Sequence, residues 1–346
     1  MALTGVNNTM HFLITGHTGF KGAWLIMLLK QRGYTVSGVS LEPNTDSLFN
    51  KVEASKLLNF DLRCDLGNLG KLEESFKEVK PDVVIHLAAQ SLVRESYRDP
   101  LPTMQTNVMG TLNLLRASQA IGGVKAQLIV TTDKVYENVG KSTGYLETDP
   151  LGGKDPYSAS KAMADIATQS WLASFENPPT AIARAGNVIG GGDICADRLI
   201  PDLVRSYCSG QIPQLRAPDS VRPWQHVLDC LNGYLLLVDK ILETKVSGAW
   251  NFGPSDLQSK SVADVAEIAG DVWGVATKWK QDLSPHPHEA SQLLLNSDKA
   301  RRELGWSDKL NLEESIRWTI DWYKNVYDGL DPVKEILKNI WEFESR

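Results

Sequence analysis

Two short runs of residues carry side chains that can move protons. Tyr157 and Lys161 are four residues apart at the start of a predicted helix, so they lie on one helix face. A lysine ammonium beside a phenol lowers the pKa of the tyrosine, which makes Tyr157 a candidate general base. Thr132, Asp133 and Lys134 directly follow a predicted strand. Together, these side chains predict acid–base chemistry on an alcohol or a sugar hydroxyl.

A glycine-rich turn near the start of the chain predicts a dinucleotide site. Gly16, Gly19 and Gly22 have the spacing G-x-x-G-x-x-G and stand between the first predicted strand and the first predicted helix. Such glycines bring the backbone close to a pyrophosphate at the helix N-terminus, where free N–H groups and the helix dipole favour an anion. This position favours a nicotinamide dinucleotide over an ordinary strand-to-helix turn.

The residues after the second and third strands bear on which dinucleotide binds. Dinucleotide folds that take NAD usually carry Asp or Glu at the end of the second strand, where it bonds the adenosine ribose. Here Ser40 has that position, Glu42 follows, and no arginine suited to a 2′-phosphate is evident beside Ser40. We therefore predict NAD, held without the usual acidic residue. Asp65, after the third strand, is either a partner of the adenine amino group or a helix N-cap.

The elements that position these residues alternate regularly in the first half of the chain. Apolar runs separated by amphipathic stretches predict an α/β fold of the Rossmann type, with a doubly wound parallel sheet. We place the NAD-binding domain at residues 11–185, partly interleaved with later segments, and a smaller, mostly helical substrate domain at residues 186–346. The predicted strands are 11–15, 35–40, 59–63, 82–87, 126–131 and 180–184. The predicted helices are 20–32, 68–79, 103–118, 156–175, 199–209, 227–242, 261–272 and 312–327.

Composition argues against several other classes of protein. The chain has 346 residues and a net charge of −6, and it therefore lacks the basic balance typical of nucleic-acid binding. It has neither a signal-peptide pattern nor an apolar run of about 18 residues, so we expect no membrane association and a cytoplasmic location. The four cysteines are widely spaced, which predicts reduced thiols. His286, His288 and Glu289 offer too few ligands in one loop, so no metal is expected.

The glycine turn, Asn107, Thr132 and the Tyr157/Lys161 pair resemble the extended short-chain dehydrogenase/reductase family. Within that family, longer segments resemble the CDP-glucose 4,6-dehydratases. They extend from about residue 11 to residue 325 and comprise GHTGFKG, HLAAQSLVR, TDK followed by YEN, DPYSASK, RAGNVIGGGD, DRLIPD, RPWQHV and HPHEA. The resemblance implies a hydro-lyase that converts a nucleotide-linked glucose to a 4-keto-6-deoxy sugar, with NAD regenerated in each turnover.

The resemblance also implies a role for each catalytic residue. Tyr157, assisted by Lys161, would deprotonate the C4 hydroxyl during oxidation of C4, and Thr132 would bond the C4 oxygen. Lys134 stands where the related dTDP-glucose dehydratases carry glutamate, and it would take the C5 proton. For that it would need a pKa lowered toward about 7–8. Asp133 would need a raised pKa, so that it stays protonated and assists loss of the C6 hydroxyl.

The binding residues follow from the same resemblance. The substrate diphosphate would contact Arg222 and Arg198, with Asn187 as a further donor. Gln90 and Ser91 would face the hexose. The predicted cofactor-binding residues are Gly16, Gly19, Phe20, Gly22, Ser40, Asp65, Leu66, Leu87, Ala88, Tyr157 and Lys161. The preference for cytosine rests on the resemblance alone, since no residue rule distinguishes it from uracil or thymine.

Other functions share most of these motifs. Another nucleotide-sugar 4,6-dehydratase or a 4-epimerase would use the same cofactor site and Tyr157/Lys161 pair, although an epimerase does not need Asp133 and Lys134. A non-catalytic NAD-binding regulatory protein typically loses the Tyr/Lys pair, which this chain keeps. The resemblance further implies a homodimer or a dimer of dimers, in which the helices near residues 103–118 and 157–175 form a four-helix bundle.

Overall fold

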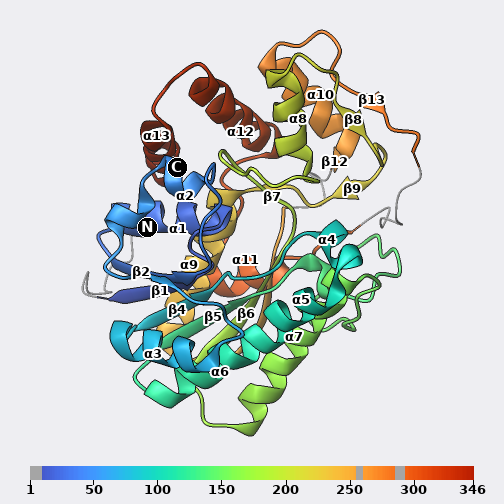
Figure 1. Ribbon diagram of the computed structural model, residues 1–346. Coiled ribbons are helices and arrows are strands. Elements are labelled where there is room, and N and C mark those ends of the chain that lie inside the picture. Colours follow the sequence, from blue (N-terminus) through green and yellow to red (C-terminus); the bar gives the residue numbers. More distant parts are fainter. Residues whose placement is uncertain (1–9, 255–259, 285–292) are drawn as a thin grey trace.

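Seven parallel strands form the central sheet of the computed structural model, which describes residues 10–254, 260–284 and 293–346 (Figure 1). The strand order is β3-β2-β1-β4-β5-β6-β11, and all neighbours are parallel. The order reverses between β1 and β4, the point at which doubly wound sheets bind ligands. The strands are β1 (His11–Thr15), β2 (Thr35–Ser40), β3 (Asp61–Arg63), β4 (Val83–His86), β5 (Ala126–Val130), β6 (Thr180–Ala185) and β11 (Gly248–Phe252).

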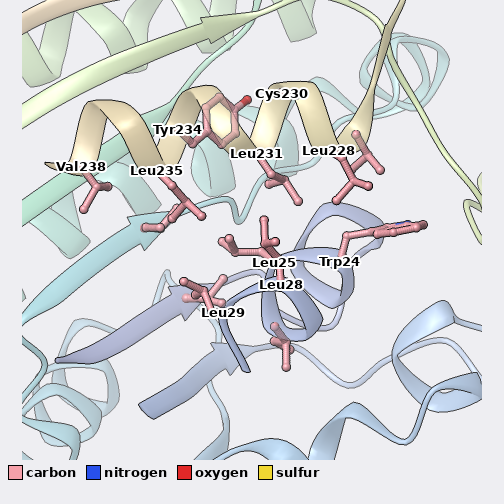
Figure 2. Close-up of a cluster of buried hydrophobic side chains, with 14 of the residues drawn as sticks. Trp24, Leu25, Leu28, Leu29, Leu228, Cys230, Leu231, Tyr234, Leu235 and Val238 are labelled. Carbon is pink, nitrogen blue, oxygen red and sulfur yellow. The ribbon is translucent and has the colours of Figure 1, made fainter. Parts of the chain in front are cut away.

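Helices cover both faces of this sheet and bury its apolar side chains (Figure 1). One face packs against α1 (Phe20–Gln31) and α9 (Val227–Thr244); the other packs against α3 (Leu69–Val79), α6 (Gly110–Ile121) and α7 (Pro156–Ser174). Figure 2 shows Leu25 of α1 opposite Leu231 of α9, both fully buried. Each such side chain contributes about 1.5–3 kcal/mol by its removal from water.

A smaller, mostly helical part of the chain stands beside the carboxyl ends of the strands. Its separate apolar core includes Leu203, Val265 and Ile316. Its elements are β7 (Val188–Ile189), α8 (Leu199–Cys208), β8 (Gln214–Leu215), β9 (Val221–Arg222), β10 (Gln225–His226), β12 (Lys260–Ser261), α10 (Val262–Trp273), β13 (Lys280–Gln281) and α12 (Leu312–Tyr327). The remaining helices are α2 (Leu48–Lys51), η1 (Ala54–Leu57), α4 (Val93–Arg98), α5 (Pro100–Met104), η2 (Gln105–Met109), η3 (Asp133–Val135), α11 (Asp298–Leu304) and α13 (Pro332–Glu344).

The predicted doubly wound α/β class is confirmed, and the differences from the predicted elements are local. The helix predicted at 103–118 is divided into α5, a π-helical turn (η2) and α6. The π turn holds Asn107, whose amide donates to the Gln90 carbonyl at 3.0 Å and to Ser160 Oγ at 2.8 Å. The helix α13 was not predicted at all.

The strand β11 was also missed, and it bears on how the chain is divided. It hydrogen-bonds to β6 in the central sheet, although it follows residue 185 by more than sixty positions. The sheet is therefore completed by a later segment, as the predicted interleaving requires. The division into residues 11–185 and 186–346 itself stays a prediction.

Two negative findings apply to the described residues. No helix among them is long and apolar enough to cross a membrane. Within the same ranges, no group of three or more His, Cys, Asp or Glu side chains could hold a metal ion. His286, His288 and Glu289, considered above as metal ligands, lie outside the described residues.

Candidate active site

A cavity of about 1000 Å³ lies between the carboxyl ends of the strands and the smaller, mostly helical part. It brings together predicted catalytic residues that come from different segments. The turn after β5 supplies one group and the start of α7 supplies the other. The predicted site residues on its wall are Phe20, Ser91, Thr132, Asp133, Lys134, Tyr157, Asn187, Arg198 and Arg222.

Tyr157 is positioned by the first turn of α7. Asp155 caps this helix by accepting the Ser158 N–H at 2.9 Å, and Pro156 occupies the first helical position, where its missing N–H costs nothing. The Tyr157 N–H, which has no partner inside the helix, donates to Ser96 Oγ at 3.1 Å. The phenol is therefore held on a rigid helix start that faces the cavity.

The phenol of Tyr157 is more basic than its spacing from Lys161 predicted. Burial raises the pKa of Tyr157 to about 12, and a hydrogen bond with Thr132 offsets only part of this shift. Lys161 donates instead to the Val130 carbonyl at 2.9 Å. The expectation that Lys161 lowers this pKa is therefore wrong for the structure as it stands, because the phenol loses its solvent and the ammonium points to the end of β5.

Lys161 itself is buried, and its ammonium group loses its proton more readily than an exposed lysine does. Burial and the nearby charge of Lys21 lower the pKa of Lys161 to about 8, while Asp165 acts in the opposite direction. The side chain is 5% exposed. Lys161 thus changes its charge near neutral pH, which suits a residue that supports proton transfer.

Thr132, Asp133 and Lys134 form one hydrogen-bonded turn at the end of β5. Thr132 donates to Asp133 Oδ1 at 2.8 Å, and the Lys134 N–H donates to Thr132 Oγ1 at 3.4 Å. Asp133 is 1% exposed. Among the described residues, its second oxygen, Oδ2, has no hydrogen-bond partner. Burial raises the pKa of Asp133, as predicted, although Lys134, Thr132 and Arg222 act against this shift. Burial therefore shifts this carboxyl toward its protonated form beside Tyr157.

The glycine turn has the close approaches that a dinucleotide site needs. Gly16 has φ +73°, and a Cβ atom there would lie 2.6 Å from the Ala88 nitrogen. A Cβ atom at Gly22 would lie 2.5 Å from the Gly16 carbonyl oxygen. Gly19 begins α1 without a side-chain cap. Only glycine fits at Gly16 and Gly22. The start of α1 presents the positive end of its helix dipole to an anion that binds there.

The other predicted cofactor residues follow the same sheet edge, at the ends of β1 to β4. Ser40 ends β2, Asp65 and Leu66 follow β3, and Leu87 and Ala88 follow β4. Asp65 accepts the Gly67 N–H at 2.8 Å, whereas Asn68 caps α3, so the alternative role of Asp65 as that cap is wrong. These residues therefore share the sheet edge at which doubly wound folds bind their ligands.

An arginine does stand beside Ser40, contrary to the sequence prediction. Arg63 is the register partner of Ser40 across β2 and β3. Its guanidinium bonds Asp61 through two nitrogens and Glu42 at 3.0 Å. Because two carboxylates already pair with this charge, Arg63 is poorly suited to attract a 2′-phosphate. The prediction of NAD therefore rests on the pairing of Arg63 with Asp61 and Glu42, and not on the absence of an arginine beside Ser40.

The predicted substrate residues divide into two groups. Arg198 donates to Asp193 and to Ser91 Oγ, each at 2.7 Å, and these residues line the cavity together with Asn187 and Arg222. Gln90 is not on the cavity wall. Its side-chain amide donates to Thr103 Oγ1 at 2.7 Å and to the Leu92 carbonyl at 3.1 Å. The structure does not bring Gln90 together with the other site residues.

Sequence reasoning missed a buried ion pair behind the site. Arg184 bonds both oxygens of Asp165 at 2.8 Å and donates to Tyr136 Oη at 2.9 Å. Asp165 also accepts the Thr131 hydroxyl at 3.2 Å. Asp165 lies four residues after Lys161 on α7, so the helix pattern could have indicated it. This cluster ties α7 to the residue that precedes Thr132.

A second missed cluster lies on the cavity wall itself. Arg94 and Arg216 both donate to Asp197, at 2.9 and 2.7 Å. These residues come from α4, the end of β8 and the loop before α8. Nothing in their sequence spacing indicates that they meet.

Comparison with known proteins gives a consistent family. A family model described as GDP-mannose 4,6 dehydratase matches residues 13–319. The CDP-glucose 4,6-dehydratase of Salmonella typhimurium is 42% identical over 329 residues, which are 92% of this chain and 91% of that protein. The dTDP-glucose 4,6-dehydratase of the same organism is 27% identical over 96% of this chain and 98% of that protein.

Solved structures show the same similarity in the fold. The dTDP-glucose 4,6-dehydratase DesIV of Streptomyces venezuelae, solved with NAD, has a TM-score of 0.81 at 25% identity and covers 94% of this chain and 100% of its own. The UDP-glucose 4-epimerase of Thermus thermophilus, also with NAD, has a TM-score of 0.78 at 26% identity and covers 91% and 99%. The chain therefore belongs to the nucleotide-sugar 4,6-dehydratase family of the extended short-chain dehydrogenase/reductases.

Proposed function

We propose that this protein is a CDP-glucose 4,6-dehydratase, a hydro-lyase that converts CDP-glucose to CDP-4-keto-6-deoxyglucose and water with catalytic NAD. The observation that carries the proposal is the single hydrogen-bonded group of Thr132, Asp133 and Tyr157 beside Lys134. An epimerase needs the tyrosine but has no use for a protonated carboxyl and an amine at this position. The 42% identity to the Salmonella typhimurium enzyme supports the substrate.

The residues present fit an NAD molecule. Gly16, Gly19 and Gly22 would hold the pyrophosphate at the start of α1, and Asp65 and Leu66 would flank the adenine. Phe20, Leu87 and Ala88 would lie along the nicotinamide half. When bound, NAD supplies a hydride acceptor for C4 and later a donor for C6, so it is not consumed.

Tyr157 takes the proton of the C4 hydroxyl as C4 is oxidised. Its pKa of about 12 must fall for this step, and the ammonium of Lys161 is the group on the same helix face that can favour the phenolate. Thr132, which is hydrogen-bonded with Tyr157, holds the C4 oxygen. The resulting ketone makes the neighbouring C5 proton acidic.

Asp133 and Lys134 then divide the elimination between them. Lys134 takes the C5 proton, while the protonated Asp133 donates to the departing C6 hydroxyl, which leaves as water. When C6 of the resulting enone is reduced, Lys134 returns a proton to C5, which completes the 4-keto-6-deoxy sugar. The raised pKa of Asp133 supports this role, because it favours the protonated form that the donation needs. Arg222 and Arg198 hold the substrate diphosphate, with Asn187 as a further donor. Gln90 and Ser91 were predicted to face the hexose, and only Ser91 lines the cavity.

A panel of nucleotide hexoses tests the proposal. The NAD-loaded protein is incubated with CDP-, dTDP-, UDP- or GDP-linked glucose in deuterated water, and the products are identified by NMR. We expect a 4-keto-6-deoxy product from CDP-glucose, with deuterium at C5 and many turnovers for each NAD. A 4-epimer without loss of water would identify an epimerase, and binding without any product would identify a regulatory protein. Steady accumulation of NADH would contradict the redox-neutral scheme.

We also propose a homodimer, or a dimer of such dimers, in the cytoplasm, where nucleotide sugars and NAD are available. The predicted helix 103–118, which comprises the end of α5, η2 and α6, packs against α7. These elements and the start of α5 carry large apolar side chains that remain exposed. Leu101 is 75% exposed and Ile166 is 51% exposed. Such a patch on a folded surface typically marks a protein interface. Pairing these helices with those of a second copy would form a four-helix bundle.

A further inference from the structure

Arg94, Asp197 and Arg216 form a charged cluster on the cavity wall that the proposed chemistry does not use. Asp197 Oδ1 accepts from Arg94 at 2.9 Å and from Arg216 at 2.7 Å. All three residues line the cavity that holds the catalytic turn. Their side chains are only partly buried, at 29% exposed for Asp197 and 24% for Arg216, so a ligand in the cavity can reach them.

The backbone holds Asp197 in an unusual conformation. Its φ of +63° lies in the left-handed region, which aspartate and asparagine adopt more readily than other non-glycine residues. The two arginines lower the pKa of Asp197 against the effect of burial, so its carboxylate stays ionised and only accepts hydrogen bonds.

Both partners keep hydrogen-bonding groups that no other described residue uses. The two arginines donate to the same oxygen of Asp197, so Oδ2 has no donor among the residues that the structure describes. Arg216 uses its terminal nitrogens on Asp197, and its Nε–H has no acceptor among those residues. The Asp197–Arg216 pair therefore has one acceptor oxygen and one donor N–H left for a ligand.

The pair lines the same cavity as the residues proposed to hold the substrate. The charge of Arg198 acts on Tyr157 and that of Arg222 acts on Asp133, so both arginines lie close to the reacting end. Asp197 directly precedes Arg198, and Arg216 directly follows β8. A substrate with its hexose at Tyr157 and its diphosphate at Arg198 would extend its base toward this pair.

We infer that Asp197 and Arg216 hydrogen-bond to the Watson–Crick edge of the nucleobase and thereby select cytosine over uracil and thymine. This inference rests on the proposed function. The edge of cytosine presents a donor at N4 and acceptors at N3 and O2. A carboxylate beside a guanidinium is complementary to that order, since acidic side chains accept from the cytosine amino group. Uracil and thymine present an acceptor at O4 and a donor at N3. Their O4 would face the Asp197 carboxylate and their N3–H would face the Arg216 guanidinium, so neither position could form a hydrogen bond.

Binding of CDP and UDP to the NAD-loaded protein tests this inference by calorimetry. The wild type should prefer CDP. Asp197→Asn suits the positive φ, since asparagine tolerates the left-handed region, and its amide can turn a donor toward O4. We expect the preference for CDP over UDP to fall about 5- to 100-fold, the discrimination of one bidentate pair. Arg216→Gln, which can accept from the uracil N3–H, should lower it further in the double variant.

Asp271→Asn is the control, since Asp271 pairs with Lys278 and does not line the cavity. It should keep the preference for CDP. The diphosphate of 2-pyrimidinone riboside, which lacks the 4-amino group, provides a test without any substitution. It should bind the wild type more weakly than CDP does, and it should bind Asp197→Asn nearly as well as CDP does.

Three outcomes would overturn the inference. These are a wild type that binds CDP and UDP equally, variants that lose affinity for both by the same factor, and variants that keep the full preference. None of them affects the proposed dehydratase activity, which is measured separately as 4-keto product from CDP-glucose. Conversely, a protein that prefers CDP but forms no keto sugar would contradict the proposed function and leave the base-reading pair supported.

Discussion

At the scale of single residues, Lys134 and Tyr157 line one cavity, and we propose that they act on different protons. Tyr157→Phe removes the group that takes the C4 hydroxyl proton, so we expect neither NADH nor product. Lys134→Met keeps the residues of the oxidation step, so a single turnover should still form enzyme-bound NADH. Product formation should fall about 10²–10⁴-fold, the usual effect of losing one positioned acid–base group. NADH absorbance and quenched product analysis measure the two steps.

Lys125→Met is a suitable control for the lysine substitution, because Lys125 pairs with Asp82 away from the cavity wall. It should keep normal turnover. Near-normal product formation by Lys134→Met, with normal deuterium uptake at C5, would mean that another residue takes the C5 proton.

Arg222 offers a second test at this scale. Replacement by alanine removes a charge-assisted contact to the diphosphate, which contributes roughly 1.5–3 kcal/mol. Substrate affinity should therefore fall about 10- to 100-fold. NAD affinity should hardly change, and calorimetry with each ligand distinguishes the two effects. Unaltered substrate affinity in a folded Arg222→Ala protein would remove this residue from the binding site.

At the scale of elements, the turn between β1 and α1 must admit the cofactor backbone. Gly16→Ala would place a Cβ atom 2.6 Å from the Ala88 nitrogen in addition to straining a φ of +73°. Gly122 has φ +63°, but a Cβ atom there would meet no other atom within 4 Å, so Gly122→Ala is matched for strain alone. Gly122→Ala should lose only the stability that its strained backbone costs, about 1–3 kcal/mol. Gly16→Ala should lose more, because its Cβ atom also meets backbone atoms. Only Gly16→Ala should also weaken NAD binding, and equal NAD affinities would argue against this turn as the pyrophosphate site.

The helix α7 carries a pH-sensitive charge into the site. The pKa of Lys161 is about 8, so its ammonium form is complete well below pH 8 and is lost as the pH rises through that value. The rate of C4 oxidation should therefore fall above about pH 8 in single-turnover experiments. Lys21→Gln removes a positive charge that lowers the pKa of Lys161, so the decrease in the rate should begin at a higher pH. If the rate decreases at the same pH in Lys21→Gln, Lys161 is not the group whose titration causes the decrease.

The residues that the sequence could predict are those joined by local spacing. Tyr157 and Lys161 share a helix face, and Thr132 to Lys134 are consecutive, so their positions follow from secondary structure alone. Asp197 and Arg216 meet only through the packing of α8 and β8, which no local pattern encodes. The pKa of Tyr157 was predicted in the wrong direction because spacing reveals a neighbouring charge but not the loss of solvent. The short strand β11 was missed because it lies among helical patterns.

At the scale of the whole molecule, the outer face of α5 and α7 remains to be covered (Figure 1). Leu101 lies on α5, Met109 ends the π turn, and Met163 and Ile166 lie on α7. Their exposed fractions are 75%, 50%, 41% and 51%. The same elements carry Tyr157 and Asn107, so an interface here would also brace the active-site helix. Dimer formation at this face would therefore support the active site as well as the stability of the fold.

Leu101→Asp combined with Ile166→Asp should therefore convert the dimer to monomers. A two-fold interface repeats each side chain, so four apolar groups lose burial worth about 1.5 kcal/mol or more each. The dimer dissociation constant should rise about 10⁴-fold or more, which sedimentation velocity can measure. Leu283→Asp is the control, because Leu283 is 86% exposed on the smaller part of the chain and its replacement should leave the dimer intact. A dimer that survives the double substitution, or a monomeric wild type, would show that these helices face solvent rather than a second copy.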